Sequence, residues 1–390
     1  MNQLALTKAT LVSPFNLVED AVVLIKDRKI LAAGSTSSIK IPPEFREIPL
    51  DGLILAPGFI DQHVHGGGGA SVMSGTVESL DEISRFHATH GTTSFLATTI
   101  SGTPEQINDV ACAFKTLTSR DYKGARCLGL HMEGPFISPY FAGAHPAETL
   151  RQPCWEEIAA IHKLSNSGVK LVTLAPELAG ASELAAALIK ANIICAIGHS
   201  NADYETANSA ISMGFRCVTH CYNQMAPFNH YAPGIIGAAF TNNQISVELI
   251  LDGIHLHRAA VEMAWRCKGP EGIILVTDAM APAGMPDGIY PGPDGALTLE
   301  GGAIRNQKGK LAGSVLTMER AVKKMLEFTE CGLTDAFRMA TYNPAKLLGI
   351  NKHKGSLYPG KDADLIALTT DLEVIMTMIG GEIVSGLISI

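Results

Sequence analysis

Two histidines, His63 and His65, stand one residue apart in the stretch PGFIDQHVHGGGG. The apolar run before them, GLILAPGFI, is typical of a buried strand, and residues i and i+2 of a strand point to the same face. We therefore expect the two imidazoles to project together from the end of the strand. Such a pair could bind a metal ion, although an isolated His-x-His also occurs where a strand simply passes into a loop.

Further ionisable residues stand at the ends of later strand-like segments. Packing would explain any one buried histidine, but several ionisable groups in one place are costly unless a cation offsets the cost. The set therefore predicts a metal site, and imidazole with carboxylate ligands suits Zn²⁺ or Fe²⁺. Its members are His63, His65, Glu133 in LGLHMEGPF, His199 in IICAIGHS, His220 in CVTHCYN and Asp278 in GIILVTDA.

Asp278 is the candidate for proton transfer. A catalytic metal site keeps a coordination position for water, lowers the pKa of that water and polarises a substrate carbonyl. A carboxylate on the last strand can then accept the proton and pass it to the leaving group. The alternatives for Asp278 are a metal ligand without proton transfer and a helix N-cap.

The pattern of apolar and polar residues along the chain predicts the strands and helices that would position these residues. Eight short apolar segments alternate with helical segments over residues 55–345, which predicts an α/β fold with a (β/α)₈ TIM-like barrel. In such a barrel the carboxyl ends of all strands open on one face, so residues far apart in sequence converge there. A doubly wound sheet is the alternative, but no GxGxxG opens a helix after a strand.

Both ends of the chain are rich in strand-like sequence. Residues 1–54 contain apolar runs joined by the turn KDRK, which predicts a hairpin, and strand-like sequence returns near the C-terminus. We predict a small β-sandwich domain formed by both chain termini, from residues 1–54 and 346–390. The barrel, residues 55–345, would be the catalytic domain.

Composition excludes several classes of function. The net charge of −8 and the lack of a basic block argue against a nucleic-acid partner. A signal peptide and a run of 18 apolar residues are both missing from the sequence, so we expect no membrane association. Eight cysteines without a CxxC pair indicate reduced thiols and a cytoplasmic protein. Only 17% of residues are charged, which is consistent with extensive burial that includes a subunit interface.

The ordered motifs resemble the amidohydrolase superfamily and, within it, the N-acetylglucosamine-6-phosphate deacetylase family. The His-x-His is shared by the whole superfamily, whereas HMEGPF together with GHS, TDAMAPAG and AGSVLTM is far more specific. The matching stretches run in family order through nearly the whole chain. The resemblance implies a cytoplasmic, homodimeric hydrolase of amino-sugar catabolism. It would cleave the acetamide of N-acetylglucosamine 6-phosphate into glucosamine 6-phosphate and acetate, using one or two divalent metal ions per subunit.

The same resemblance implies roles for single residues. Glu133, His199 and His220 look like the principal metal ligands, and His63 and His65 look like ligands of a second metal. Asp278 resembles the catalytic acid/base, and His145 in GAHP resembles the residue that stabilises the oxyanion at the acetamido oxygen. The positions that resemble the substrate-binding set are Ala144, His145, Asn223, Gln224, Tyr231, Asp252, His255, Leu311, Ala312 and Gly313.

One position departs from the family pattern. The family usually has an Arg shortly after the stretch that reads YNQMA here, and this Arg reaches the phosphate in a neighbouring subunit. In this chain the segment reads YNQMAPFNHYAPG, with Tyr231 at that position and His230 before it. Arg binds phosphate through a charged fork, for which Tyr and His are weaker substitutes. The substrate could therefore be N-acetylgalactosamine 6-phosphate or an unphosphorylated N-acetyl sugar, or Arg258 could take over the phosphate.

Two other functions compete with this interpretation. The first is a superfamily hydrolase of a cyclic amide or of a ring that it deaminates, which HMEGPF and GAHP disfavour. The second is a non-enzymatic scaffold that keeps only the fold. The full set of ligand-type residues disfavours the scaffold.

Overall fold

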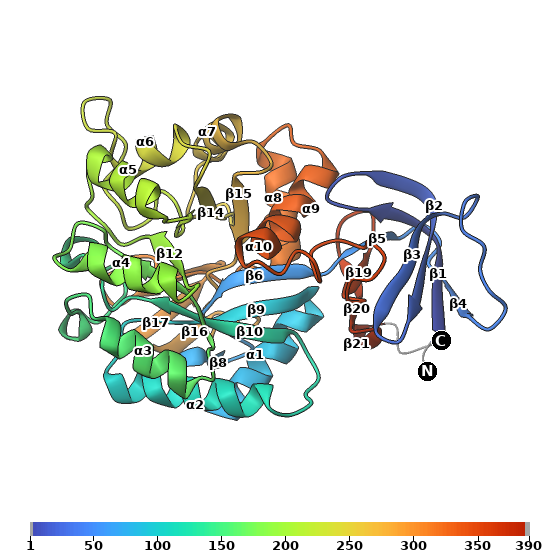
Figure 1. Cartoon of the computed structure of the whole chain (residues 1–390), viewed down its shortest axis with the longest axis horizontal. Coiled ribbons are helices and arrows are strands. Elements are labelled where there is room, and N and C mark those ends of the chain that lie inside the picture. The colour runs from blue at the N-terminus through green and yellow to red at the C-terminus, as the bar shows by residue number, and fades with distance from the viewer. Residues whose placement is uncertain (1–2, 387–390) are drawn as a thin grey trace.

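The eight apolar segments form one sheet of eight parallel strands, and hydrogen bonds just beyond the first and last strands bring its two edges together. The computed structural model describes residues 3–386 of the chain and confirms the predicted α/β barrel (Figure 1). Apolar side chains such as Val172, Ile197 and Leu249 are completely buried between these strands and the surrounding helices. The barrel strands are β6 (Phe59–Val64), β9 (Thr92–Thr99), β10 (Arg126–Glu133), β11 (Val169–Leu174), β12 (Ile194–Ile197), β13 (Cys217–Val218), β14 (Ser246–Ile250) and β15 (Ile273–Val276).

The seam of the barrel lies between the first and last strands. There the backbone N–H of Asp278 donates to the carbonyl of His63 at 2.9 Å, and that of His65 donates to the carbonyl of Ala279 at 2.9 Å. The predicted His-x-His pair and the predicted acid/base are thus joined by main-chain hydrogen bonds, although they lie far apart in the sequence.

Helices cover the outside of the barrel. Local sequence explains their starts, as in α2, where Thr103 caps the first turn, Pro104 occupies the first helical position and Gln106 completes a capping box. The short helix α6 was not predicted. The helices are α1 (Val77–Thr89), α2 (Pro104–Thr118), α3 (Trp155–Leu164), α4 (Ala181–Lys190), α5 (Tyr204–Met213), α6 (Gly234–Phe240), α7 (Arg258–Lys268), α8 (Met318–Phe328), α9 (Leu333–Ala340) and α10 (Tyr342–Leu347).

Strands from both ends of the chain form one further sheet, at the right of Figure 1. The two ends meet where β5 pairs antiparallel with β19. The predicted KDRK hairpin is confirmed between β2 and β3, and Asp27 and Arg28 have the left-handed φ values (49° and 69°) that tight hairpin turns require. The strands are β1 (Gln3–Val12), β2 (Leu17–Lys26), β3 (Lys29–Ser35), β4 (Arg46–Pro49), β5 (Ile54–Pro57), β19 (Leu365–Leu368), β20 (Val374–Ile379) and β21 (Glu382–Gly386).

The sheet curls around its own apolar core, to which Leu6, Val23 and Leu365 contribute. Pro57 is the last residue of β5 and Phe59 the first of β6, so the chain passes from this sheet to the barrel at Gly58. The division into 1–54 with 346–390 and 55–345 stays a prediction.

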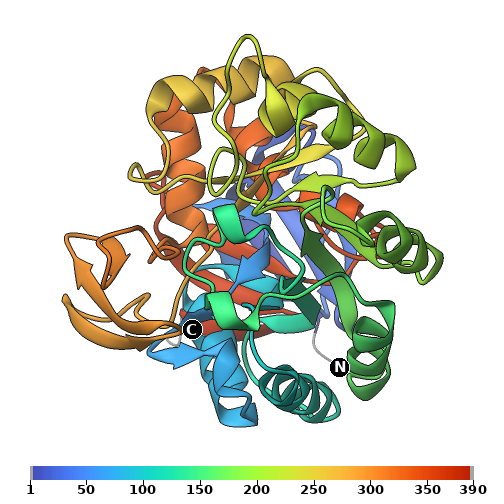
Figure 2. The same cartoon turned by 90° about the vertical axis from the view of Figure 1, so that its left-hand side faces the viewer.

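An antiparallel sheet that the sequence analysis did not predict follows the last barrel strand. It consists of β16 (Gly288–Gly292), β17 (Gly295–Glu300) and β18 (Ala303–Asn306), and it projects from the side of the barrel in Figure 2. After β18 the chain turns back, and the N–H of Ala312 donates to the carbonyl of Ile304 at 3.1 Å. This return places residues 310–313 beside the barrel opening.

No helix within residues 3–386 is long and apolar enough to cross a membrane.

Candidate metal centre and active site

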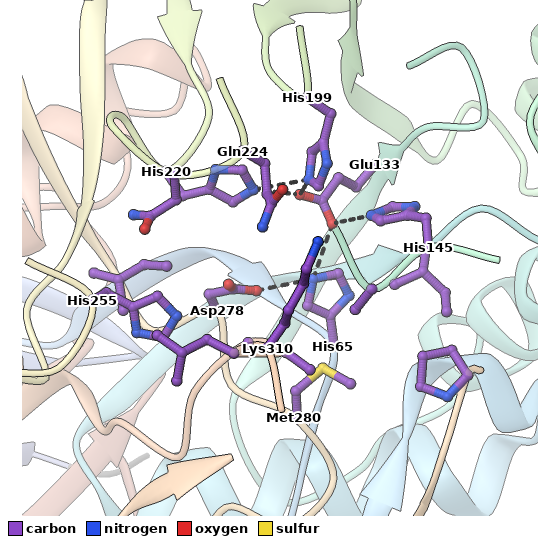
Figure 3. Close-up of a pocket in the computed structure, with 18 residues that line it drawn as sticks. His65, Glu133, His145, His199, His220, Gln224, His255, Asp278, Met280 and Lys310 are labelled. Carbon is purple, nitrogen blue, oxygen red and sulfur yellow. Dashed lines mark hydrogen bonds and ion pairs between the residues drawn. The ribbon is translucent and has the colours of Figure 1, made fainter. Parts of the chain in front are cut away.

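The six residues predicted as metal ligands converge at one end of the barrel. Each lies at the carboxyl end of its strand or in the one or two residues after it, and each is almost completely buried. Figure 3 shows five of them pointing toward one another around a single cavity. The six are His63, His65, Glu133, His199, His220 and Asp278.

Glu133 stands at the centre of the cluster and divides it into two halves. Its Oε1 lies 3.1 Å from Nε2 of His199 and 3.0 Å from Nε2 of His220. Its Oε2 lies 3.2 Å from Nε2 of His65. One carboxylate is therefore shared between a His63/His65 half and a His199/His220 half.

The distances within each half suit a bound cation. The Nε2 atoms of His63 and His65 are 3.1 Å apart, and those of His199 and His220 are 3.0 Å apart. Two imidazole nitrogens on one tetrahedral zinc ion, each about 2.0–2.1 Å from it, would be about 3.3 Å apart. The spacing in each half is thus close to that of two imidazole ligands on one divalent ion.

Hydrogen bonds on the far side of the rings fix which nitrogen faces the centre. Nδ1 of His65 donates to the carbonyl of Thr98 at 3.1 Å, and Nδ1 of His199 donates to the carbonyl of Phe141 at 2.7 Å. A carbonyl can only accept, so Nδ1 carries the proton in both rings and, when the ring is neutral, the Nε2 lone pair faces Glu133. This is the arrangement of a metal-ligating histidine.

His145 has the opposite tautomer. Its Nδ1 accepts a hydrogen bond from the backbone N–H of Ser101 at 2.9 Å, so its proton is on Nε2. That nitrogen lies 3.3 Å from Oε2 of Glu133 and is directed into the cavity. His145 is therefore presented as a hydrogen-bond donor, although its position alone would also allow it to be a ligand.

The backbone is strained where it delivers these side chains. His199, His220 and Asp278 have positive φ values of 48°, 28° and 51°, in the left-handed region that residues other than glycine seldom adopt. Such strain is concentrated at functional sites, where the surrounding structure holds it in place. Here it turns each side chain inward directly after its strand ends.

Carboxylates and histidines stabilise each other's charged forms within the cluster. Burial alone would raise the pKa of Glu133 and of Asp278, but the neighbouring histidines, His63 foremost, outweigh it and hold both pKa values below their usual range. Burial would likewise lower the pKa of His65, but the carboxylates of Asp278 and Glu133 raise it to about 9. Both carboxylates are thus ionised, which a divalent cation requires.

A cavity of about 400 Å³ opens above the cluster. Most of the predicted substrate-binding residues line it. Asp252 and His63 lie behind its wall, and the Oδ2 of Asp252 accepts from Nδ1 of the lining residue His255 at 2.7 Å. The predicted residues that line the cavity are His65, Glu133, Ala144, His145, His199, His220, Asn223, Gln224, His255, Asp278, Leu311, Ala312 and Gly313.

Tyr231 lies away from this cavity. Its side chain is 88% exposed and lines a separate surface hollow near α5. The predicted alternative cation, Arg258, is the first residue of α7 and does not line the cavity either. Lys310 does line it, and among the described residues it is the only lysine or arginine to do so. Figure 3 shows its side chain among those drawn around the cavity.

Sequence reasoning missed several residues of this region. Lys310 could not be placed without the β16–β18 sheet. Glu248, Asp61 and His131 are completely buried behind the ligands. Their one visible signal was a charged or polar residue inside an apolar strand-like run, as in SVELILDG and GFIDQHVH.

Known proteins that are similar to this chain identify its family. The model of the amidohydrolase family matches residues 54–384. The chain belongs to the amidohydrolase family. This agrees with the resemblance stated from its motifs and with the cluster at the barrel's carboxyl end. Members of the family characteristically use divalent metal ions, and the histidine and glutamate groups described above could hold one.

Individual amidohydrolases are similar over nearly the full chain. N-acetylglucosamine-6-phosphate deacetylase of Bacillus subtilis (strain 168) is 40% identical, with 96% of this chain and 95% of that protein covered. N-acetylgalactosamine-6-phosphate deacetylase of Escherichia coli O157:H7 is 37% identical, with 86% and 89% covered. The structure of a mutant N-acetyl-D-glucosamine-6-phosphate deacetylase from Mycobacterium smegmatis, in complex with N-acetyl-D-glucosamine-6-phosphate, has a TM-score of 0.92 at 30% identity, covering 98% and 100%.

Proposed function

We propose that this amidohydrolase hydrolyses the acetamide of N-acetylglucosamine 6-phosphate to glucosamine 6-phosphate and acetate. The observation that carries the proposal is the pairing of a His/carboxylate cluster with His145, a donor of opposite tautomer, on the floor of one cavity. A hydrolase of an uncharged amide needs both a centre that activates water and a donor for the carbonyl oxygen. The names of the relatives supply the substrate class.

The metal centre is proposed to hold two divalent ions per subunit, zinc or iron. His199, His220 and Glu133 would hold one, and His63, His65 and Glu133 the other. Asp278 is the remaining candidate ligand, with its Oδ1 3.1 Å from Nε2 of His65. Bound there, a divalent ion would lower the pKa of a water molecule and polarise the substrate carbonyl.

Asp278 and His145 divide the remaining chemistry. A carboxylate oxygen of Asp278 accepts a proton from the attacking water. The Nε2–H of His145 donates to the acetamide oxygen as negative charge develops on it. When the carbon–nitrogen bond breaks, Asp278 returns the proton to the departing amine, so that acetate and the free amino sugar leave.

Lys310 is proposed to take the charge of the 6-phosphate. Lys310 lines the cavity, whereas Tyr231 does not, and its ammonium group can pair with a phosphate oxygen. His255, oriented by Asp252, would add a second donor from the loop between β14 and α7. The missing arginine of the family pattern would thus be replaced from within the subunit.

N-acetylgalactosamine 6-phosphate is the alternative substrate. It is favoured by the Escherichia coli relative, whose 37% identity is close to that of the Bacillus subtilis protein. The two sugars differ in the orientation of one hydroxyl, and both carry the acetamide and phosphate that the cavity would bind.

We also propose a cytoplasmic homodimer. All eight cysteines are free, as expected of a reducing compartment. Exposed aromatic side chains near the cavity loops, Tyr140, Phe228 and Tyr231, offer apolar area for a second subunit.

Acetate release by purified, metal-loaded protein tests the proposal. The substrates are N-acetylglucosamine 6-phosphate, its galacto epimer and unphosphorylated N-acetylglucosamine, compared by kcat/KM. The proposal expects the first to be preferred. Preference for the epimer would select the alternative, and equal activity without phosphate would exclude a role for Lys310. No release from any of the three would refute the function.

A further inference from the structure

Glu248 is a carboxylate inside the barrel that the proposed chemistry does not use. It lies in the middle of β14, where its neighbours Val247 and Leu249 are buried apolar residues, and it is 0% exposed. A carboxylate buried to this extent is costly unless hydrogen bonds hold its charge. Its contacts therefore indicate what it is for.

Two of those contacts are to proposed metal ligands. The Oε2 of Glu248 accepts from Nδ1 of His63 at 3.1 Å and from the backbone N–H of His220 at 3.1 Å. Its Oε1 accepts from Nε2 of Gln62 at 2.7 Å. Within residues 3–386 its ion pairing is with His63 alone.

We propose that Glu248 is a positioning residue for the metal centre. With the Nδ1 proton of His63 held by Oε2, the Nε2 of that ring faces Glu133 and Asp278, both at 3.4 Å. His65 and His199 are held instead by neutral carbonyls. A carboxylate partner makes the ring a stronger ligand, so His63 is the ligand that Glu248 tunes.

Glu248 also ties the two halves of the cluster together. The same oxygen that orients His63 holds the backbone of His220, which has the strained φ of 28°. The inference rests on the proposed metal centre, because it assigns Glu248 to the half that contains His63 and His65.

The substitution Glu248→Gln tests this with little change of shape. Gln62 has an Oε1 without a hydrogen-bond partner, so its amide can turn over and accept from the new amide. Glu319→Gln is the matched control, because Glu319 accepts from Nδ1 of His90 at 2.8 Å outside the cluster. Metal-free forms of wild type and both variants are titrated with Zn²⁺, and their melting temperatures are compared.

We expect Glu248→Gln to weaken the binding affinity for one zinc equivalent by about 10- to 100-fold. The affinity for the other equivalent should stay within about 3-fold of the wild-type value. The metal-free melting temperature should match that of wild type, and Glu319→Gln should bind both equivalents normally. Unchanged affinity for both zinc equivalents in Glu248→Gln would overturn the positioning role. So would a metal-free variant whose melting temperature falls in proportion to the lost zinc affinity, because the effect would then be one of stability. A wild-type protein that binds neither Zn²⁺ nor Fe²⁺ would instead refute the proposed function.

A measurement on the unaltered protein gives a second test. In ¹⁵N-histidine spectra of the zinc-loaded protein, His63 should carry its proton on Nδ1 and its metal on Nε2. The reverse assignment would overturn the inference even if the variant did not fold.

Discussion

The floor and the rim of the cavity are built in different ways. The floor consists of Glu133, His145 and Asp278 with the ligand histidines, all buried and fixed by hydrogen bonds to the backbone or to each other. The rim consists of Lys310 and the loop that carries Tyr231, whose side chain is 88% exposed.

The difference separates chemistry from selectivity. Groups on the floor cannot move or be exchanged without leaving a buried charge or donor unpaired, so the reaction type is fixed there. Groups on the rim face water and can be replaced at small cost to the fold. The replacement of the family arginine by Tyr231 is a change on the rim. Substitutions on the floor should therefore lower kcat, whereas substitutions on the rim should change substrate binding.

The largest loss is expected for Asp278→Asn on the floor. The amide keeps the shape but cannot accept the water's proton, so kcat should fall by about 10²- to 10⁴-fold. Steady-state kinetics and metal analysis of the same sample check this. Activity close to wild type would refute the acid/base role, and loss of metal from the variant would show that Asp278 is a metal ligand.

A somewhat smaller loss is expected for His145→Ala, which removes the proposed oxyanion donor. We expect kcat to fall by about 10²- to 10³-fold with metal content unchanged. If excess Zn²⁺ restored the activity, His145 would be a ligand and the tautomer argument would be wrong.

On the rim, Lys310→Ala should act on substrate binding alone. Loss of one charge-assisted contact to phosphate should raise KM for the phosphorylated sugar by about 10-fold and leave the unphosphorylated sugar unaffected. Lys308→Ala is the control, because that side chain is 75% exposed and pairs with Asp294 at 3.6 Å. Equal effects of the two substitutions would exclude a specific contact by Lys310.

The smallest effect is expected for Tyr231→Ala. The side chain is exposed and away from the cavity, so kcat/KM should change by less than about 2-fold. A larger change that disappeared with unphosphorylated substrate would show that Tyr231 of a second subunit reaches the phosphate.

Much of the floor was predictable from sequence because strand periodicity dictates it. His63 and His65 alternate within one strand, and the other ligands stand at the ends of apolar runs whose parallel packing brings them together. The tautomer of His145 was not predictable, because it depends on the backbone N–H of Ser101, which lies 44 residues away.

The rim was predicted less completely because loops and insertions determine it. Lys310 enters the cavity through the return of the chain after β18, and the sequence analysis did not predict that sheet. Tyr231 was placed by its position in a motif, whereas the loop conformation turns it outward. Glu248 was not predicted, since a lone charge in an apolar run does not reveal a buried partner.

Removing the metal and returning it tests whether the hydrolysis depends on a divalent metal ion. Acetate release from N-acetylglucosamine 6-phosphate is measured with the purified protein, after chelation and dialysis, and after addition of Zn²⁺ or Fe²⁺. We predict that chelation abolishes release and that one of the two ions restores it. Full activity in protein shown by elemental analysis to be free of metal would show that the hydrolysis does not depend on a metal ion.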